Sequence, residues 1–216
     1  MVKIKRTCAP KELSKTNKAF RAATEGMSTE EAYRFYKENH KKYCYNTSET
    51  KRKKRKMNHE RCSFCTTMIQ DFEDAMTVEH IRIKRDYPKK IFQWSNMLCA
   101  CSTCNNKRST HVHILEKYLD PTKTDDVENY FCFLADGMVT ANEELDEVDR
   151  KKAEYMIKLY KLNRDELVCK RREFLVDLIS DNDYYEKLDK MGESSQNIIF
   201  LSVFVYYKKC KTASYN

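Results

Sequence analysis

Two Cys-x-x-Cys pairs constrain this chain more than any other feature of its sequence. Cys62 and Cys65 form the first pair, Cys101 and Cys104 form the second, and 35 residues separate the pairs. Each pair delivers two thiolates from one short turn, and two such turns complete the tetrahedral shell of a zinc ion. Because sulfur then occupies every coordination position, the sequence predicts a structural zinc ion that takes no part in catalysis.

The start of the chain and the remaining cysteines bear on the cellular compartment. The basic first residues are followed by no apolar core of the kind that a signal peptide needs. A cysteine-rich chain without an export signal is typical of a reducing compartment, so we expect a cytoplasmic protein. No apolar stretch approaches the length needed to cross a bilayer, so no membrane protein is expected. We interpret the cysteines outside the pairs as ordinary buried residues: Cys8, Cys44, Cys99, Cys132, Cys169 and Cys210.

Composition predicts a mainly helical fold. The 216 residues include only 3 Gly and 3 Pro, which argues against a sandwich of many short strands joined by tight turns. Ser28 with Glu31, and Asn163 with Glu166, have the spacing of helix-capping pairs. A short strand followed by a turn is expected over residues 130–134. Helices are expected over residues 12–24, 29–44, 146–162 and 167–179, whereas 198–207 is compatible with a helix or an apolar strand.

Positive charge is concentrated in the first quarter of the chain. Residues 1–56 contain 17 Lys and Arg against 6 Asp and Glu, residues 57–120 contain 9 against 8, and residues 121–216 contain 15 against 19. A concentrated basic region favours phosphate-rich partners such as nucleic acids.

Six consecutive cations form the most basic segment. They are Lys51, Arg52, Lys53, Lys54, Arg55 and Lys56. We expect that such a run forms no buried element. It is compatible with a solvated loop or frayed helix end, with a strip that contacts phosphates, or with a nuclear localisation signal.

The region between the cysteine pairs predicts two strands followed by a helix. Residues 75–83 alternate β-branched side chains, residues 92–98 are expected to form a second strand, and residues 102–111 suit a short helix. Within this ββα unit, Glu79 and His80 lie at a strand end. Taken alone, such short motifs give many false positives, and a buried structural histidine is the ordinary alternative.

The order of the polar residues and cysteines resembles the HNH, or ββα-metal, nuclease family, in its subgroup with a four-cysteine zinc site. Cys62-x2-Cys65 is followed by Val78-Glu79-His80, then by Trp94-Ser95-Asn96-Met97-Leu98, and then by Cys101-x2-Cys104-Asn105. The resemblance implies an α+β fold that is mainly α, with a small ββα-metal core stapled by zinc. The expected regions are a basic helical region at 1–56, the nuclease core at 57–120, and a helical region packing on the core at 121–216.

The same resemblance implies roles for the polar residues of the core. His80 corresponds to the general base that takes a proton from the attacking water, and Asn96 to the residue that holds the loop so that His80 is aimed correctly. Glu79 and Asn105 correspond to the ligands of a catalytic Mg²⁺ or Mn²⁺. Glu79 stands where Asp is usual, and Asn105 where many members have His. Further phosphate contacts are expected from Arg85, Lys107 and Arg108.

A narrower resemblance covers nearly the whole chain. It is to the PtuB family, the HNH subunits of bacterial Septu-type anti-phage defence systems, some of them associated with retrons. It rests on Lys3–Arg6, Ala9–Leu13, the ββα core, Phe133–Gly137, Leu159–Asn163 and the pair Arg171 and Arg172. It implies an ATPase partner of the PtuA type. From charge alone, we expect the acidic C-terminal helices to be the docking surface for that partner.

The sequence therefore predicts a metal-dependent endonuclease that hydrolyses phosphodiester bonds, with DNA favoured over RNA. Two alternatives stay open. One is an RNA endonuclease, of the kind that cuts tRNA, with the same site. The other is a non-catalytic zinc module that binds nucleic acid through the basic run.

Overall fold

The computed structural model of the chain is mainly helical, with two small antiparallel sheets, which confirms the predicted α+β class. It describes all residues except 70–75, 109–113, 193–197, 199 and 214–216, and the side chains of Lys107 and Arg108 also lie outside the description. Among the described residues, no helix has the length and apolar character that a membrane span requires.

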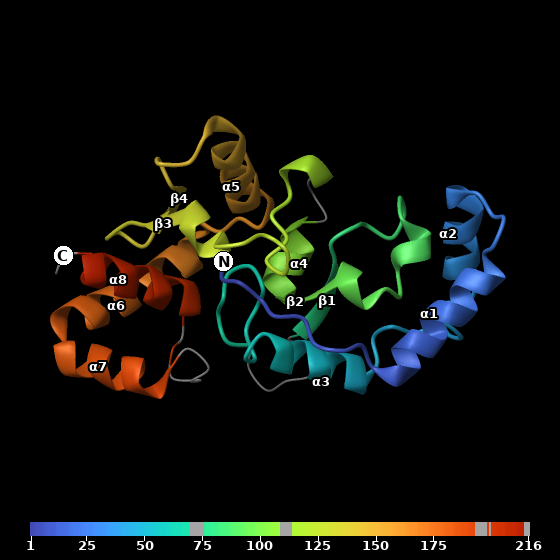
Figure 1. Cartoon of the computed structure of the whole chain (residues 1–216), viewed down its shortest axis with the longest axis horizontal. Coiled ribbons are helices and arrows are strands. Elements are labelled where there is room, and N and C mark those ends of the chain that lie inside the picture. The colour runs from blue at the N-terminus through green and yellow to red at the C-terminus, as the bar shows by residue number, and fades with distance from the viewer. Residues whose placement is uncertain (70–75, 109–113, 193–197, 199, 214–216) are drawn as a thin grey trace.

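The N-terminal helices form one end of the molecule (Figure 1). They are α1 (Lys11–Ala23) and α2 (Thr29–Glu38). The predicted capping box is present, because Ser28 Oγ accepts from the Glu31 amide at 3.3 Å and the Glu31 carboxylate accepts from the Ser28 amide at 2.8 Å. Helix α2 is shorter than predicted and ends before Cys44. At its end, the Asn39 side chain donates to the carbonyl of Phe35 at 2.9 Å.

The basic run lies in a helix, α3 (Ser48–Met57), and one face of this helix is buried. The hydroxyl of Thr47 accepts from the Thr50 amide and caps its first turn. One face of α3 packs on the first strand pair, and residues spaced three or four apart share that face. Thr50, Lys54 and Met57 are therefore buried. The expectation that the run forms no buried element is wrong at Lys54.

The predicted order of strand, strand and helix is present, with the helix beginning within the second cysteine pair. Strands β1 (Met76–His80) and β2 (Met97–Cys101) pair antiparallel, with His80 opposite Met97. Helix α4 (Ser102–Arg108) packs against both strands. The first strand ends earlier than predicted and the second begins later, because 3-10 turns η2 (Pro88–Lys90) and η3 (Trp94–Asn96) occupy the connection. Residue 75 of the predicted strand and residues 109–111 of the predicted helix lie outside the described residues.

The described residues of the C-terminal part form a second hairpin and helices α5 to α8. The predicted strand is β3 (Phe131–Phe133), and its partner β4 (Val139–Ala141) was not predicted. Gly137 lies in the connecting turn at a φ of 89°, where a Cβ atom would come within 2.2 Å of the Val168 carbonyl oxygen. The 3-10 turns of this part are η4 (Leu115–Lys117) and η5 (Val127–Tyr130), and the helices are α5 (Glu147–Leu159), α6 (Asp165–Ser180), α7 (Asn182–Met191) and α8 (Leu201–Ala213).

Asn163 does not cap a helix as its spacing with Glu166 predicts. Its side-chain amide accepts from the Val139 amide and donates to the Val139 carbonyl, both at 2.8 Å, so it extends the edge of β4. Helix α6 begins after Arg164 with no side-chain cap. The segment left open as helix or strand is helical from Leu201 onward.

The segment before α1 packs into a core shared by the three regions of the chain, residues 1–56, 57–120 and 121–216. Buried apolar residues from all of them form one core cluster, which includes Met1, Val2 and Ile4. The Ile4 amide donates to the Pro121 carbonyl at 2.8 Å. In Figure 1 this segment lies at the centre, with the β1–β2 hairpin and α3 on one side and the C-terminal helices on the other.

Candidate metal and catalytic site

The four paired cysteines lie together in the structure. The sulfur atoms of Cys62, Cys65, Cys101 and Cys104 are all within 4.8 Å of one another, and Cys65 Sγ is 3.9 Å from Cys101 Sγ. Tetrahedral thiolates at about 2.3 Å from a zinc ion have sulfur separations of about 3.8 Å. The cluster can therefore hold a metal ion, and its size suits zinc.

Two turns deliver the sulfurs. In the first turn, the Cys62 amide donates to the Thr67 carbonyl at 3.0 Å, and the Ser63 amide donates to the Cys99 carbonyl at 2.8 Å. The second hydrogen bond fastens this turn to β2. The second cysteine pair spans the junction of β2 with α4, so a metal ion would connect the first turn to β2 and to α4.

The four thiols of the cluster differ in the direction of their pKa shifts. Hydrogen bonds among them lower the pKa of Cys65 and Cys101, whereas burial raises the pKa of Cys62 and a hydrogen bond with Cys101 raises the pKa of Cys104. Hydrogen bonds from Cys101 and the other cluster thiols, with a further one from the Thr67 hydroxyl at 2.9 Å, hold the pKa of Cys65 well below its usual value. Arg164 Nη1 donates to Cys104 Sγ at 3.8 Å. A four-cysteine zinc centre carries net negative charge, which this guanidinium partly offsets. Nothing in the sequence around Arg164 marks it for this role.

The prediction that the remaining cysteines are buried is wrong for most of them. Cys8, Cys44, Cys169 and Cys210 are exposed, and Cys132 is half-buried. Only Cys99 is buried, because it lies in β2, against which α3 and α4 pack. Helical cysteines such as Cys169 lie on outward faces, which a cysteine count does not reveal.

His80 ends β1 and is held in one orientation. Its Nε2 is 2.9 Å from the carbonyl oxygen of Ile91, and the ring of Tyr45 meets the imidazole edge to face with centroids 4.7 Å apart. A carbonyl only accepts hydrogen bonds, so Nε2 carries the proton and Nδ1 is the basic nitrogen of the neutral ring. The side chain is 5% exposed, and burial, with help from the Lys84 and Lys54 charges, lowers the pKa of His80 to about 3.

Asn96 ties together the two ends of the connection between β1 and β2. Its Oδ1 accepts from the Arg82 amide at 2.7 Å, and its Nδ2 donates to the carbonyls of Arg82 and Lys90 at 3.1 and 3.0 Å. Its own carbonyl accepts from the Ile81 amide at 2.9 Å. The residue after His80 is thus bonded directly to Asn96.

Glu79 is buried beside a tyrosine from the C-terminal part. The Tyr160 hydroxyl donates to Glu79 Oε1 at 3.4 Å, and Glu79 is 5% exposed. Tyr160 stacks on Phe64 of the first cysteine turn, with centroids 3.7 Å apart. The periodicity of its helix marks Tyr160 only as a core residue, so sequence reasoning missed this contact.

Asn105 lies in the second turn of α4 and is half-buried. Helix α4 packs against β1, which carries Glu79 and His80. In the described part of the chain, no hydrogen bond joins Asn105 to either residue, so a metal ion shared by Asn105 and Glu79 stays a prediction. Lys107 lies further along the same helix, and Arg108 is its last residue.

The predicted phosphate contacts differ in exposure. Arg85 is exposed and pairs with Asp86 at 2.7 Å. In α3, Arg52 and Lys56 are exposed, and Lys51, Lys53 and Arg55 are half-buried. Arg55 pairs with Glu60 at 2.5 Å. Lys54 has no exposed surface, so it is not available to a phosphate, which corrects that prediction.

Lys54 instead supports the turn that enters β2. Its Nζ donates to the carbonyls of Met97 at 2.6 Å and Trp94 at 3.1 Å, and lies 3.5 Å from the centroid of the Trp94 ring. Arg6 Nη1 donates to the same two carbonyls, at 3.1 and 2.8 Å. The Trp94 indole in turn donates to the Thr7 carbonyl at 2.6 Å. Nothing in the sequence pattern marked Arg6 or the buried side of Lys54 for this role.

A comparison with known proteins finds a partial relative. The chain is 33% identical over 66 residues to the Septu protein PtuB of Bacillus thuringiensis. The matched stretch covers 31% of this chain and 26% of that protein, so the match spans about a quarter of the relative. The chain matches no model of a known protein family.

Proposed function

We propose that the chain is a metal-dependent HNH endonuclease that hydrolyses phosphodiester bonds. The orientation of His80 carries the proposal. Its Nε2 proton is donated to the Ile91 carbonyl, so Nδ1 is the proton acceptor of the ring. In the sequence, His80 directly follows Glu79, whose carboxylate is buried. Both residues lie at the end of β1, and β1 packs against α4, the helix that contains Asn105.

His80 acts as the general base in this proposal. A neutral imidazole accepts a proton from water that attacks the phosphorus, and burial keeps the imidazole of His80 neutral at cellular pH. Arrival of an anionic phosphodiester beside the ring raises its pKa toward neutrality and makes it a stronger base. Asn96 holds the loop that supplies the Ile91 carbonyl, and so keeps the ring in place.

Glu79 and Asn105 would hold Mg²⁺ or Mn²⁺. A carboxylate and an amide oxygen are hard donors that suit these ions, and a carboxylate as buried as Glu79 is favoured by a nearby cation. When bound, the ion stabilises negative charge on the phosphate and on the departing oxygen. The separate four-cysteine cluster would hold Zn²⁺ and keep the hairpin and α4 together.

The substrate in this proposal is DNA, held by the basic residues around the core. The exposed and half-buried cations of α3, with Arg85, Lys107 and Arg108, would contact phosphates. The same site chemistry acts on RNA, because the polar residues contact phosphate and not the sugar. Matched DNA and RNA substrates decide between the two.

The partial similarity to a Septu PtuB supports a role in anti-phage defence. In this proposal an ATPase of the PtuA type is the partner, and the C-terminal part docks it. The acidic excess of this part lies in the segments outside helices α5 to α8, which corrects the expectation that the helices themselves are acidic. Deleting residues 140–216 would then prevent co-purification with the ATPase. Recovery of the intact assembly with that deletion would contradict the docking surface.

A metal-site comparison tests the nuclease proposal. Asn105→Ala and Glu79→Gln are assayed beside Asn106→Ala, the exposed neighbour on the same helix, on matched DNA and RNA with Mg²⁺. We expect the first two variants to lose cleavage by a factor of 100 or more, on the order of what loss of a catalytic charge stabiliser costs, and Asn106→Ala to retain it. Cleavage within tenfold of wild type in Asn105→Ala and Glu79→Gln would contradict the metal site.

A further inference from the structure

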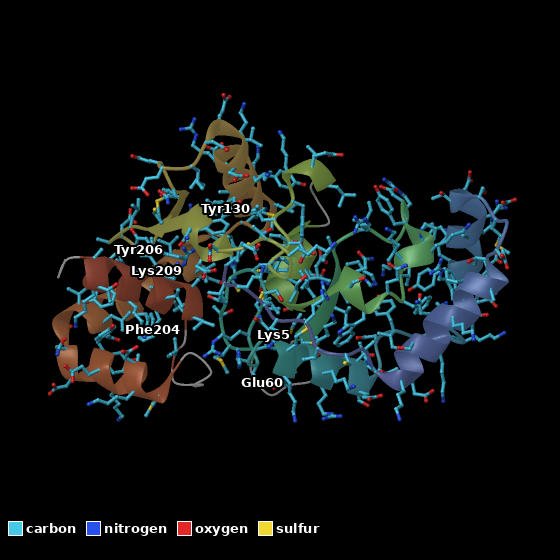
Figure 2. The ribbon with its side chains drawn as sticks, in the orientation of Figure 1. Lys5, Glu60, Tyr130, Phe204, Tyr206 and Lys209 are labelled. Atoms are coloured by element: carbon cyan, nitrogen blue, oxygen red, sulfur yellow. The ribbon has the colours of Figure 1, made fainter. Side chains whose placement is uncertain are left out.

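A basic cleft lies outside the ββα unit. It is formed by the N-terminal segment, the end of α3 and the start of α8, and has a volume of about 440 Å³. Binding sites for small ligands have volumes of about 300–1,000 Å³. Apolar side chains including Met57 and Leu201 line part of it. The cationic lining residues are Lys3, Lys5, Arg6 and Lys56, of which Figure 2 labels Lys5.

Lys5 and Lys56 carry most of the uncompensated charge of the cleft. Both side chains are exposed, and no carboxylate in the described ranges lies within ion-pairing distance of either. Lys3 is already paired with Asp125 at 2.6 Å. Among the residues that the structure describes, one acidic residue lines the cleft, Glu128, whose carboxylate lies 3.8 Å from Lys209 outside the lining. The cleft is therefore positive overall and attracts anions.

The cationic surface continues from the cleft along α3. Lys56 belongs to both, and Arg52 lies one turn earlier on the same exposed face. The ten residues of α3 span about 15 Å. The phosphates of one strand are about 3.4 Å apart along the axis of a DNA duplex, so this length matches several successive phosphates of a duplex strand. The exposed cations Arg52 and Lys56, one helical turn apart, continue to Lys5 in the cleft. Such spaced charges suit the repeating charge of a nucleic-acid backbone better than the irregular charge of an acidic peptide.

We propose that this cleft binds the phosphate backbone of a nucleic-acid strand, with Lys5 and Lys56 as its main contacts. The proposal rests on the proposed nuclease function, for which it supplies a path for the strand away from the cut. Arg6 links the cleft to the β1–β2 hairpin that carries His80. It lines the cleft, and it donates to the carbonyl of Met97, which pairs with His80 in the hairpin.

Fluorescence anisotropy with a short labelled single-stranded DNA tests the cleft. The measurement uses full-length protein carrying His80→Ala, so that the probe is not cut. In this background, Lys5→Gln with Lys56→Gln is compared with Lys187→Gln and Lys190→Gln, two exposed lysines on α7. We expect the cleft variant to bind about tenfold or more weakly. Its slope of log affinity against log salt should fall by about 1.4, the value for two lost phosphate contacts on a single strand. The α7 variant should match its parent.

Three outcomes would contradict strand binding in the cleft. They are no binding of the probe by the parent, equal affinity of both lysine variants, and competition by a free mononucleotide that is as effective as competition by unlabelled strand. The result is separable from the nuclease proposal. If wild type cuts DNA and the cleft variant binds the probe normally, the proposal of strand binding in the cleft is wrong and the nuclease proposal stands. If the probe binds through Lys5 and Lys56 but wild type cuts nothing, the nuclease is wrong and the cleft stands.

Discussion

Lys54 Nζ donates a 2.6 Å hydrogen bond to the carbonyl oxygen of Met97, the residue that pairs with His80 between β1 and β2. Arg6 donates to the same oxygen at 3.1 Å. Two basic side chains from segments remote in the sequence thus hold the turn that contains Asn96. The basic N-terminal quarter of the chain therefore supports the candidate catalytic loop from inside, in addition to presenting charge on the surface.

The buried Lys54 should make stability depend on pH. Burial, followed by the nearby charge of Arg6, lowers its pKa from 10.5 to about 6. Between these two values the unfolded chain binds the Lys54 proton and the folded chain does not, so the free energy of unfolding rises with pH across this window. Urea unfolding of Lys54→Met at about pH 6.5 and about pH 9 should show a smaller rise than wild type. Lys53→Met, on the outer part of α3, is the control and should rise as wild type does. A rise in Lys54→Met equal to that of wild type would show that Lys54 is charged in the folded protein.

The four-cysteine cluster should be needed for folding. Cys62→Ser removes one ligand of the cluster, and Cys169→Ser removes an exposed cysteine as the control. We expect one zinc per wild-type chain by elemental analysis, loss of that zinc in Cys62→Ser, and a fall in the free energy of unfolding of more than about 4 kcal/mol. Full stability of Cys62→Ser without bound metal would contradict a structural metal site.

Arg164 should slow the loss of metal from the cluster. Its guanidinium donates to Cys104 Sγ, which offsets thiolate charge and lowers the tendency of the sulfur to accept a proton. Arg164→Ala should release zinc to a chelator several-fold faster, as followed with a colorimetric zinc indicator. Lys170→Ala changes the same charge at an exposed site on α6 and should release zinc at the wild-type rate. Identical rates in all three proteins would remove Arg164 from the metal site.

Asn96 should contribute to stability through three side-chain hydrogen bonds. Asn96→Ala leaves the Arg82 amide and two carbonyls without these partners in a buried place, which costs about 1–3 kcal/mol per unsatisfied group. Denaturant unfolding should show a loss of at least that size. The matched control is Asn142→Ala, which removes two exposed side-chain hydrogen bonds, one to the Asn129 carbonyl and one from the Glu144 amide, and should cost little because water can replace them. Similar losses in both variants would mean that Asn96 does not hold the loop.

Features set by local spacing were predictable from the sequence. Each Cys-x-x-Cys pair positions its own sulfurs, and alternation and capping residues indicate where strands and helices begin. The cluster of Cys62, Cys65, Cys101 and Cys104, the strand–strand–helix order and the box at Ser28 were therefore found. The helix over the basic run was missed because its six cations obscured the buried face that Thr50, Lys54 and Met57 share.

Features set by contacts between distant segments were not predictable. Lys54 is 43 residues from Met97, and Tyr160 is 81 residues from Glu79. Asn163 satisfies the Val139 backbone 24 residues away in place of its own helix. In each case the residue type was noticed, but a tertiary contact decided its partner. A single sequence contains no periodic signal for such contacts.

The most direct test of the central claim is single-turnover cleavage of plasmid DNA by wild type, His80→Ala and His40→Ala in Mg²⁺, with zinc content measured for each protein. His40 is an exposed histidine outside the candidate site. The account predicts that His80→Ala loses cleavage by a factor of 100 or more, as expected for removal of a general base, and that His40→Ala cleaves like wild type, with equal zinc in all three. Cleavage by His80→Ala within tenfold of wild type, at full zinc content, would contradict it.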